Sequence, residues 1–148
     1  MISNLLNERN LPQLKSREEM LEILYREEYG YLPPKPLKTE WEVEKNIIHN
    51  FCAGKARLDR VTITTKLLSG TFQFPIYVAI PTGGGKHPFF IHINFRDDVP
   101  DRYMPTEELI DHGFAVISFS YQDVTKDDDD FTNGKPHPMI DPTNRISR

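Results

Sequence analysis

The fold is decided by residues 88–119, PFFIHINFRDDVPDRYMPTEELIDHGFAVISF. Two segments of this stretch, residues 88–95 and residues 114–119, are almost continuously apolar, which is typical of parallel strands that are covered on both faces. The segment between them, residues 105–113, begins with proline, carries two glutamates near its start and ends in glycine, as a short helix does. A strand, a helix and a strand in this order predict a right-handed crossover between two parallel strands.

An antiparallel hairpin is predicted upstream of this crossover. Polar and apolar residues alternate over residues 57–67, and every second residue is apolar over residues 72–80. The Ser-Gly pair at residues 69–70 fits a turn between two strands. Pro75 favours an edge or a bulge, because proline lacks the N–H that a sheet interior requires. Residues 41–51 are expected to be extended as well.

A helix is predicted near the N-terminus. Ser16 and Glu19 match a capping box, and apolar residues follow at helical spacing, namely Met20, Leu21, Leu24 and Tyr25. Gly30 is expected to end the helix. The sequence therefore predicts an α/β fold: an N-terminal helix, an antiparallel hairpin region and one parallel strand-helix-strand crossover.

Composition excludes several classes of protein. Of the 148 residues, 38% are hydrophobic and 27% are charged, which suits one ordinary domain with a core. The net charge of −4, without a basic stripe, argues against nucleic-acid binding. The first residues form no basic leader, and no run approaches the roughly 20 apolar residues of a membrane helix. We therefore expect a cytoplasmic protein that binds neither nucleic acid nor membrane.

No metal or cofactor is predicted. Cys52 is the single cysteine, so an internal disulfide and a cysteine metal cluster are excluded, and a half-buried place in a strand region is expected for it. The histidines lack zinc-ligand spacing, and His92, inside an apolar segment, is expected to be a hydrogen-bonded core residue. Four consecutive aspartates, residues 127–130, cannot all converge on one calcium ion. The TGGGK segment, residues 82–86, lacks the first glycine of a phosphate loop and precedes a predicted strand.

Four segments resemble a known family in their order and spacing: LYREEYGYLPPKP (24–36), FFIHINF (89–95), PTEELIDHGFAVISFSYQDV (105–124) and DDDDFTNG (127–134). Together they are similar to the N-terminal half of the bacterial glucuronoyl esterase and acetyl xylan esterase-like branch of the α/β-hydrolases. The resemblance covers roughly residues 11–134. It implies a partial α/β-hydrolase sheet in a truncated domain over residues 1–134, with an irregular tail over residues 135–148.

The resemblance implies a serine esterase that acts on decorated plant polysaccharide, with its nucleophile on a Gly-x-Ser-x-Gly-like turn after a further strand and helix. None of the six serines of this sequence has glycines at that spacing: Ser3, Ser16, Ser69, Ser118, Ser120 and Ser147. A triad rebuilt from His137 and Asp141 is disfavoured, because the candidate serines, Ser118 and Ser120, belong to a predicted strand. We therefore predict no catalytic residue, and an incomplete hydrolase that is inactive alone.

The loop after the first parallel strand is the part of the family's site that this sequence retains. In α/β-hydrolases the corresponding turn supplies a backbone N–H to the oxyanion hole. The matching residues are Asn94, Phe95 and Arg96, which lack glycine-rich character, so the resemblance implies a vestigial oxyanion loop. The alternative is a polar loop in which Arg96 pairs with Asp97 or Asp98 in solvent.

The first parallel strand is also expected to form an edge of the sheet, since the strand that flanks it in the full hydrolase is not recognised here. The edge comprises Phe89, Phe90, Ile91, His92, Ile93, Asn94 and Phe95, without the lysine or proline that protects an edge. We therefore expect a homodimer through this edge. The alternative function is a non-enzymatic binding or assembly module that recognises carbohydrate or a carbohydrate ester through Trp41, Tyr31 or Tyr103.

Overall fold

The computed structural model describes residues 16–31 and 34–125. The chain divides into two compact units, residues 1–34 and residues 35–148. The domain boundary predicted at residue 134 lies outside the described residues. No helix within the described ranges is both long and apolar enough to cross a membrane.

The first unit contains helix α2, Arg17–Leu24, which continues into a π-helical turn, η1, Tyr25–Tyr29. The Ser16 hydroxyl accepts a hydrogen bond from the Glu19 N–H at 3.3 Å, and the Glu19 carboxylate accepts one from the Ser16 N–H at 2.8 Å. This arrangement confirms the predicted capping box. Gly30 follows with a φ of 74°, a left-handed conformation that ends the helix as predicted.

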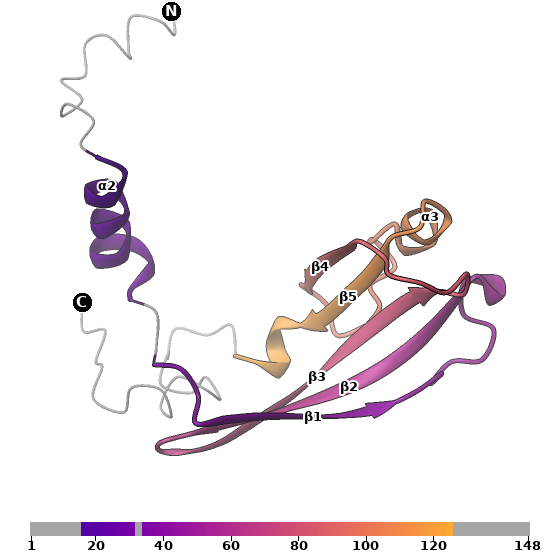
Figure 1. Cartoon of the computed structure of the whole chain (residues 1–148), viewed down its shortest axis with the longest axis horizontal. Coiled ribbons are helices and arrows are strands. Elements are labelled where there is room, and N and C mark those ends of the chain that lie inside the picture. The colour runs from indigo at the N-terminus through magenta and orange to yellow at the C-terminus, as the bar shows by residue number, and fades with distance from the viewer. Residues whose placement is uncertain (1–15, 32–33, 126–148) are drawn as a thin grey trace, which may run out of the picture. The chain divides into compact units, whose positions relative to one another are not determined.

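The second unit is built on a five-stranded sheet with the order β1-β2-β3-β5-β4 (Figure 1). Its strands are β1 (Lys38–Glu44), β2 (Ala56–Leu67), β3 (Gly70–Pro81), β4 (Phe89–Asn94) and β5 (Ala115–Ser120). The pairs β1–β2, β2–β3 and β3–β5 are antiparallel, whereas β4 and β5 are parallel. Helix α3, Thr106–Asp111, lies between β4 and β5 in the chain. The predicted α/β fold with one parallel crossover is confirmed.

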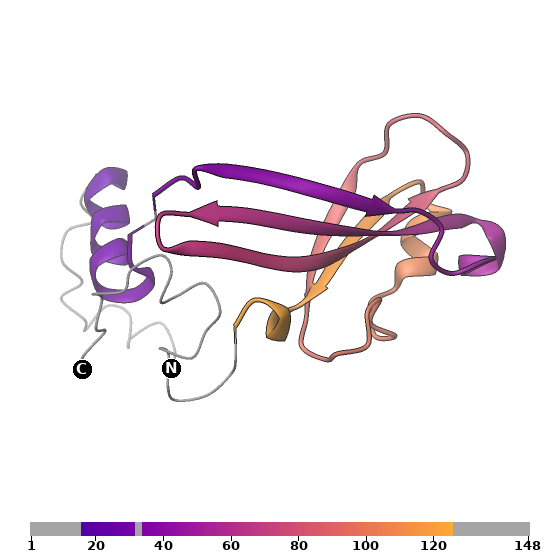
Figure 2. The same ribbon diagram turned by 90° about the horizontal axis from the view of Figure 1, so that it is seen from below.

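The β2–β3 hairpin is longer than the rest of the sheet. Its two strands pair along their whole length, but β5 pairs with β3 only over residues 77–79, so the turn end of the hairpin extends past β5 (Figure 2). Pro75 lies in this overhang, where β2 is the one described neighbour of β3. The edge position predicted for Pro75 is therefore confirmed, because no ladder hydrogen bond is required of it on the second side.

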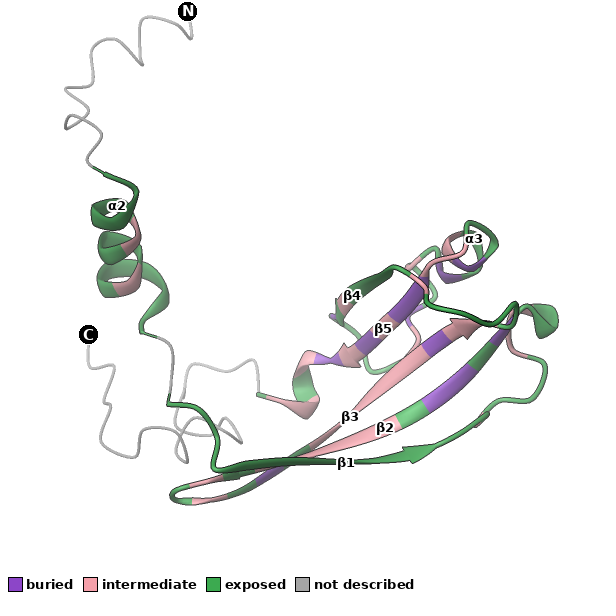
Figure 3. Cartoon of the chain, in the orientation of Figure 1, coloured by how far each residue is buried: buried purple, intermediate pink, exposed green. Residues whose placement is uncertain are grey.

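The core lies between α3 and one face of the sheet. Leu58, Ala79 and Val116 are register neighbours in one row across β2, β3 and β5, and each is at most 2% exposed. Ile110 of α3, 4% exposed, packs against this row together with Ala56. Buried residues accordingly gather on β5, on α3 and on the adjoining ends of β2 and β3 (Figure 3).

The coverage expected for the two parallel strands is correct for β5 and wrong for β4. Strand β5 is buried or half-buried along its whole length. In β4, Phe89, Ile91 and Ile93 are 57%, 63% and 60% exposed. The difference follows from position: β5 is central, whereas β4 is an edge strand whose outer face no described element covers. An apolar run alone does not distinguish these two environments.

The segment expected to be extended over residues 41–51 is extended only as far as Glu44, where β1 ends, and the chain bends and turns over residues 47–50. Asn46 and Asn50 adopt φ angles of 56° and 61°, in the left-handed region that asparagine tolerates better than most residues. Cys52, with a φ of 49°, lies in a short helical turn, η2, Phe51–Gly54. It is half-buried as predicted, but the predicted strand environment is wrong.

Candidate functional site

The candidate site lies at the carboxyl ends of β4 and β5. Asn94 and Ser120 are register neighbours there, and His92 and Ser118 form the next pair on the same face. Asn94, Ser118 and Ser120 are 0%, 2% and 4% exposed, which is unusual burial for polar side chains. In open α/β sheets, ligands bind beyond the carboxyl ends of the strands. The sheet therefore places four polar side chains where such a site would be expected.

Asn94 fixes the loop that follows β4. Its side-chain Nδ2 donates a hydrogen bond to the carbonyl oxygen of Asp98 at 3.0 Å. Its Oδ1 is buried without a hydrogen-bond partner among the described residues. This hydrogen bond connects the predicted vestigial oxyanion loop to Asn94, the last residue of β4.

The other two residues of that loop pack against aromatic rings. Phe95 stacks on Tyr121 with ring centres 5.5 Å apart. The Arg96 guanidinium lies 4.1 Å from the centre of the Tyr103 ring, a cation–π geometry. Among the described residues Arg96 forms no ion pair with Asp97 or Asp98, so the alternative pairing considered from the sequence is wrong. Asp98 instead lies 3.4 Å from Arg102.

Sequence reasoning missed Asp101, which is 8% exposed. Its Oδ1 accepts a hydrogen bond from the Tyr103 N–H at 2.9 Å, and its Oδ2 lies 3.7 Å from Nε2 of His92. That separation exceeds a hydrogen bond, and His92 is 31% exposed, so the expectation of a hydrogen-bonded core histidine is wrong. The available signal was local: aspartate often bonds the backbone N–H two residues ahead, as Asp101 does.

A histidine, an aspartate and two serines therefore gather on one face, but they do not form a hydrolytic triad. The Ser120 hydroxyl accepts a hydrogen bond from the Gln122 N–H at 3.3 Å and caps a short turn, η3, Tyr121–Asp123. No hydrogen bond joins either serine to His92 within residues 34–125. A nucleophile must contact its base and reach the substrate, and neither condition is met here. His137 and Asp141 lie outside the described residues.

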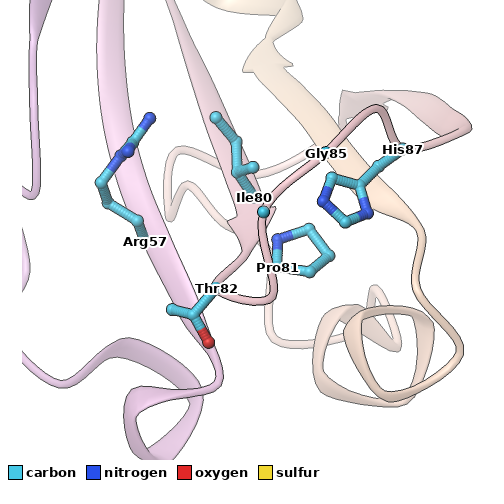
Figure 4. Close-up of a pocket in the computed structure, with 7 residues that line it drawn as sticks. Arg57, Ile80, Pro81, Thr82, Gly85 and His87 are labelled. Atoms are coloured by element: carbon cyan, nitrogen blue, oxygen red, sulfur yellow. The ribbon is translucent and has the colours of Figure 1, made fainter.

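A pocket of about 420 Å³ lies at the opposite end of β4 (Figure 4), lined by Arg57, Ile80, Pro81, Thr82, Gly84, Gly85 and His87. Three of its lining residues belong to the TGGGK segment, which comes before β4 in the chain. Asn94 is the last residue of β4, so the length of the strand separates it from the pocket. Nε of Arg57 is 2.8 Å from the Asp59 carboxylate, so the guanidinium is already paired. Nδ1 of His87 is 3.1 Å from the Gly113 carbonyl oxygen. This pocket is not part of the candidate site.

No three His, Cys, Asp or Glu side chains come together as a metal cage within the described ranges. The aspartates at residues 127–130 lie outside those ranges, so the prediction that they bind no calcium stays a prediction.

Asn94→Ala is expected to lower the free energy of unfolding by about 1–3 kcal/mol, because the Asp98 carbonyl loses its donor and a buried space opens. Backbone amides of residues 95–100 should exchange faster in the variant. Hydrogen exchange and urea unfolding measure both effects. An unchanged loop would show that this hydrogen bond does not hold it. Gln73→Ala, which removes an exposed amide side chain from β3, is the comparison substitution and should leave the exchange of residues 95–100 unchanged.

No protein-family model matches this chain. Solved structures do match it. A glucuronoyl esterase from Solibacter usitatus aligns with a TM-score of 0.62 and 18% identity, over 90% of this chain and 41% of that chain. A CE15 glucuronoyl esterase from Teredinibacter turnerae T7901 gives a TM-score of 0.62 and 15% identity, over 85% and 35%. A promiscuous CE15 esterase from the marine bacterial metagenome aligns with a TM-score of 0.60 and 16% identity, over 80% of this chain and 38% of that chain.

This chain has the fold of part of a CE15 esterase. The resemblance to glucuronoyl esterases and the partial α/β-hydrolase sheet predicted from the sequence are both confirmed at the level of fold. The chain spans about two fifths of the length of the first two esterases, 41% in each alignment. Because the identities are 15–19%, the likeness describes the backbone and leaves the chemistry of this chain to be argued from its own residues.

Proposed function

We propose that this chain is the N-terminal part of a carbohydrate-ester hydrolase sheet, with uronic-acid esters or acetylated xylan as the ancestral substrate class, and that it does not hydrolyse esters alone. The observation that carries this proposal is the loop after β4. It lies at the carboxyl end of a parallel strand and is fixed there by the buried Asn94. In this fold, that is where a backbone N–H is aimed at a developing oxyanion.

The absence of activity is proposed on chemical grounds. Ser118 and Ser120 are nearly inaccessible, and the hydroxyl of Ser120 is engaged as a cap. No serine of the sequence has the flanking glycines of a strained nucleophile turn. An oxyanion donor stabilises charge only after a nucleophile has attacked, so this loop alone supports no acyl transfer. A cytoplasmic location stays a prediction.

Turnover of p-nitrophenyl acetate and of a benzyl ester of glucuronic acid tests this proposal. The purified chain is expected to hydrolyse both at the rate of buffer alone. Ser118→Ala and Ser120→Ala are the controls. Hydrolysis above the buffer rate that disappears in either variant would overturn the proposal, because it would identify a working nucleophile.

A carbohydrate-binding module is the second candidate, favoured by the exposure of Trp41, which is 68% exposed on β1. Tyr103 and Tyr31 are 67% and 63% exposed. Trp41 is the single tryptophan of the sequence, so its fluorescence reports on that position alone. A saturable fluorescence change with xylo-oligosaccharide, abolished in Trp41→Ala, would favour the module. Unchanged fluorescence would favour the incomplete hydrolase.

A further inference from the structure

Strand β4 has a row of backbone groups that pair with no other strand among the described residues. The Pro88 carbonyl oxygen accepts a hydrogen bond from the Ala115 N–H at 2.8 Å, so the backbone groups of every second residue from Pro88 onward face β5. The N–H and C=O groups of the residues between them, Phe89, Ile91 and Ile93, consequently point away from β5. No strand lies on that side among the described residues.

The same three residues also expose their side chains. Phe89, Ile91 and Ile93 are 57%, 63% and 60% exposed, and alternation places them on the face opposite to the row that α3 covers. Within residues 34–125, each of the three therefore leaves both its outward backbone groups and an apolar side chain uncovered. An edge of this kind is a template for pairing with another strand.

The opposite edge of the sheet, β1, is built differently. Its sequence KTEWEVE contains three glutamates, Glu40, Glu42 and Glu44, and one lysine. Two copies of β1 placed side by side would bring acidic residues against each other, which is destabilising. β4, FFIHIN, carries no acidic residue and no lysine or arginine. A second copy of the chain therefore meets no like-charge repulsion at β4.

We propose that β4 pairs with β4 of a second copy, antiparallel, about a two-fold axis at Ile91. Ile91 then lies opposite Ile91 of the second copy, and Phe89 lies opposite Ile93. Each of these facing residues exchanges both of its backbone hydrogen bonds, and the β-branched and aromatic side chains pack across the junction. The two sheets become one, as closed two-fold symmetry allows. This dimer does not depend on the proposed hydrolase ancestry.

A matched pair of lysine substitutions tests the position of the interface. Ile91 and Val43 are both exposed β-branched residues, in the two edge strands, at 63% and 47% exposure. Ile91→Lys puts a charge against its own copy at the axis, whereas Val43→Lys leaves β4 unchanged. In light scattering over a dilution series, the wild type and Val43→Lys should show twice the 17.2 kDa chain mass. Ile91→Lys should show the single-chain mass with unchanged circular dichroism.

Ile91→Pro gives an independent variant should the lysine impair folding. The N–H it removes points away from β5, so the β4–β5 ladder is retained while a hydrogen bond to the second copy is lost, and a monomer is expected. Amide exchange at Phe89, Ile91 and Ile93 should slow as the wild-type concentration rises.

Four results would overturn the proposal. The first is a wild-type chain that is monomeric at every concentration. Slow amide exchange along β4 in that monomer would show that another segment of the same chain covers the edge. A dimer that survives Ile91→Lys and Ile91→Pro, or one lost in Val43→Lys, would place the interface elsewhere. A heterogeneous series of larger masses would indicate unspecific aggregation in place of a two-fold dimer.

Discussion

Leu58→Ala is expected to lower the free energy of unfolding by about 2–5 kcal/mol, because it opens a cavity in the core. Leu58 is 1% exposed and lies in the row with Ala79 and Val116 beneath α3. Ala79 is too small to move into the space. Few other described residues are both large and fully buried, so compensation from elsewhere in the core is limited.

The control for this substitution is Leu68→Ala, the same change at a residue that is 86% exposed in the turn between β2 and β3. It should change stability by less than about 0.5 kcal/mol. Urea unfolding followed by circular dichroism measures both variants. Equal effects would show that the row centred on Ala79 is not the part of the chain that stabilises the sheet.

The stability of the sheet unit is expected to fall in acid through Asp59, which is 3% exposed. Burial by itself raises the pKa of this carboxyl, but hydrogen bonds from the Arg57 guanidinium and the Asn46 N–H outweigh it, and the net pKa lies below its usual value. A carboxyl whose pKa is lower in the folded state stabilises the fold above its unfolded pKa of about 3.9. That stabilisation is lost as pH falls through the folded value.

Asp59→Asn should therefore lower stability at neutral pH by about 1–3 kcal/mol, since the charge-assisted bonds to Arg57 are weakened. The stability of the variant should also decline less between about pH 4 and pH 2 than that of the wild type. Asp98→Asn makes the same change in a more exposed ion pair, with Arg102, and should have little effect. Urea unfolding at several pH values tests both. Parallel pH profiles for wild type and Asp59→Asn would refute the assignment.

The hairpin and the parallel crossover were predictable from the sequence because each carries a local signal. The apolar runs at residues 88–95 and 114–119, separated by a helical segment, specify a parallel crossover whatever the rest of the chain does. The alternation over residues 57–67 and 72–80 specifies the hairpin in the same way. These signals depend on neighbours in the chain, and the structure reproduces them.

The candidate site was less accessible, because its contacts join distant residues. Nothing near His92 in the sequence indicates that Asp101 lies 3.7 Å from it, and nothing near Arg96 indicates that it stacks on Tyr103. The prediction that β4 is covered on both faces was wrong because an apolar run has the same sequence pattern in an edge strand and in a central strand. Asn94 was found because the family resemblance marked its position, but its bond to Asp98 was not.

The central claim is that this chain carries the scaffold of an esterase site without an activated serine. Intact-protein mass spectrometry after incubation with a fluorophosphonate tests it most directly, because an activated serine displaces fluoride and retains the phosphonyl group whatever its natural substrate. We expect the mass to stay at that of the unmodified 17.2 kDa chain. A stoichiometric phosphonyl adduct on any serine of the folded protein would contradict the claim.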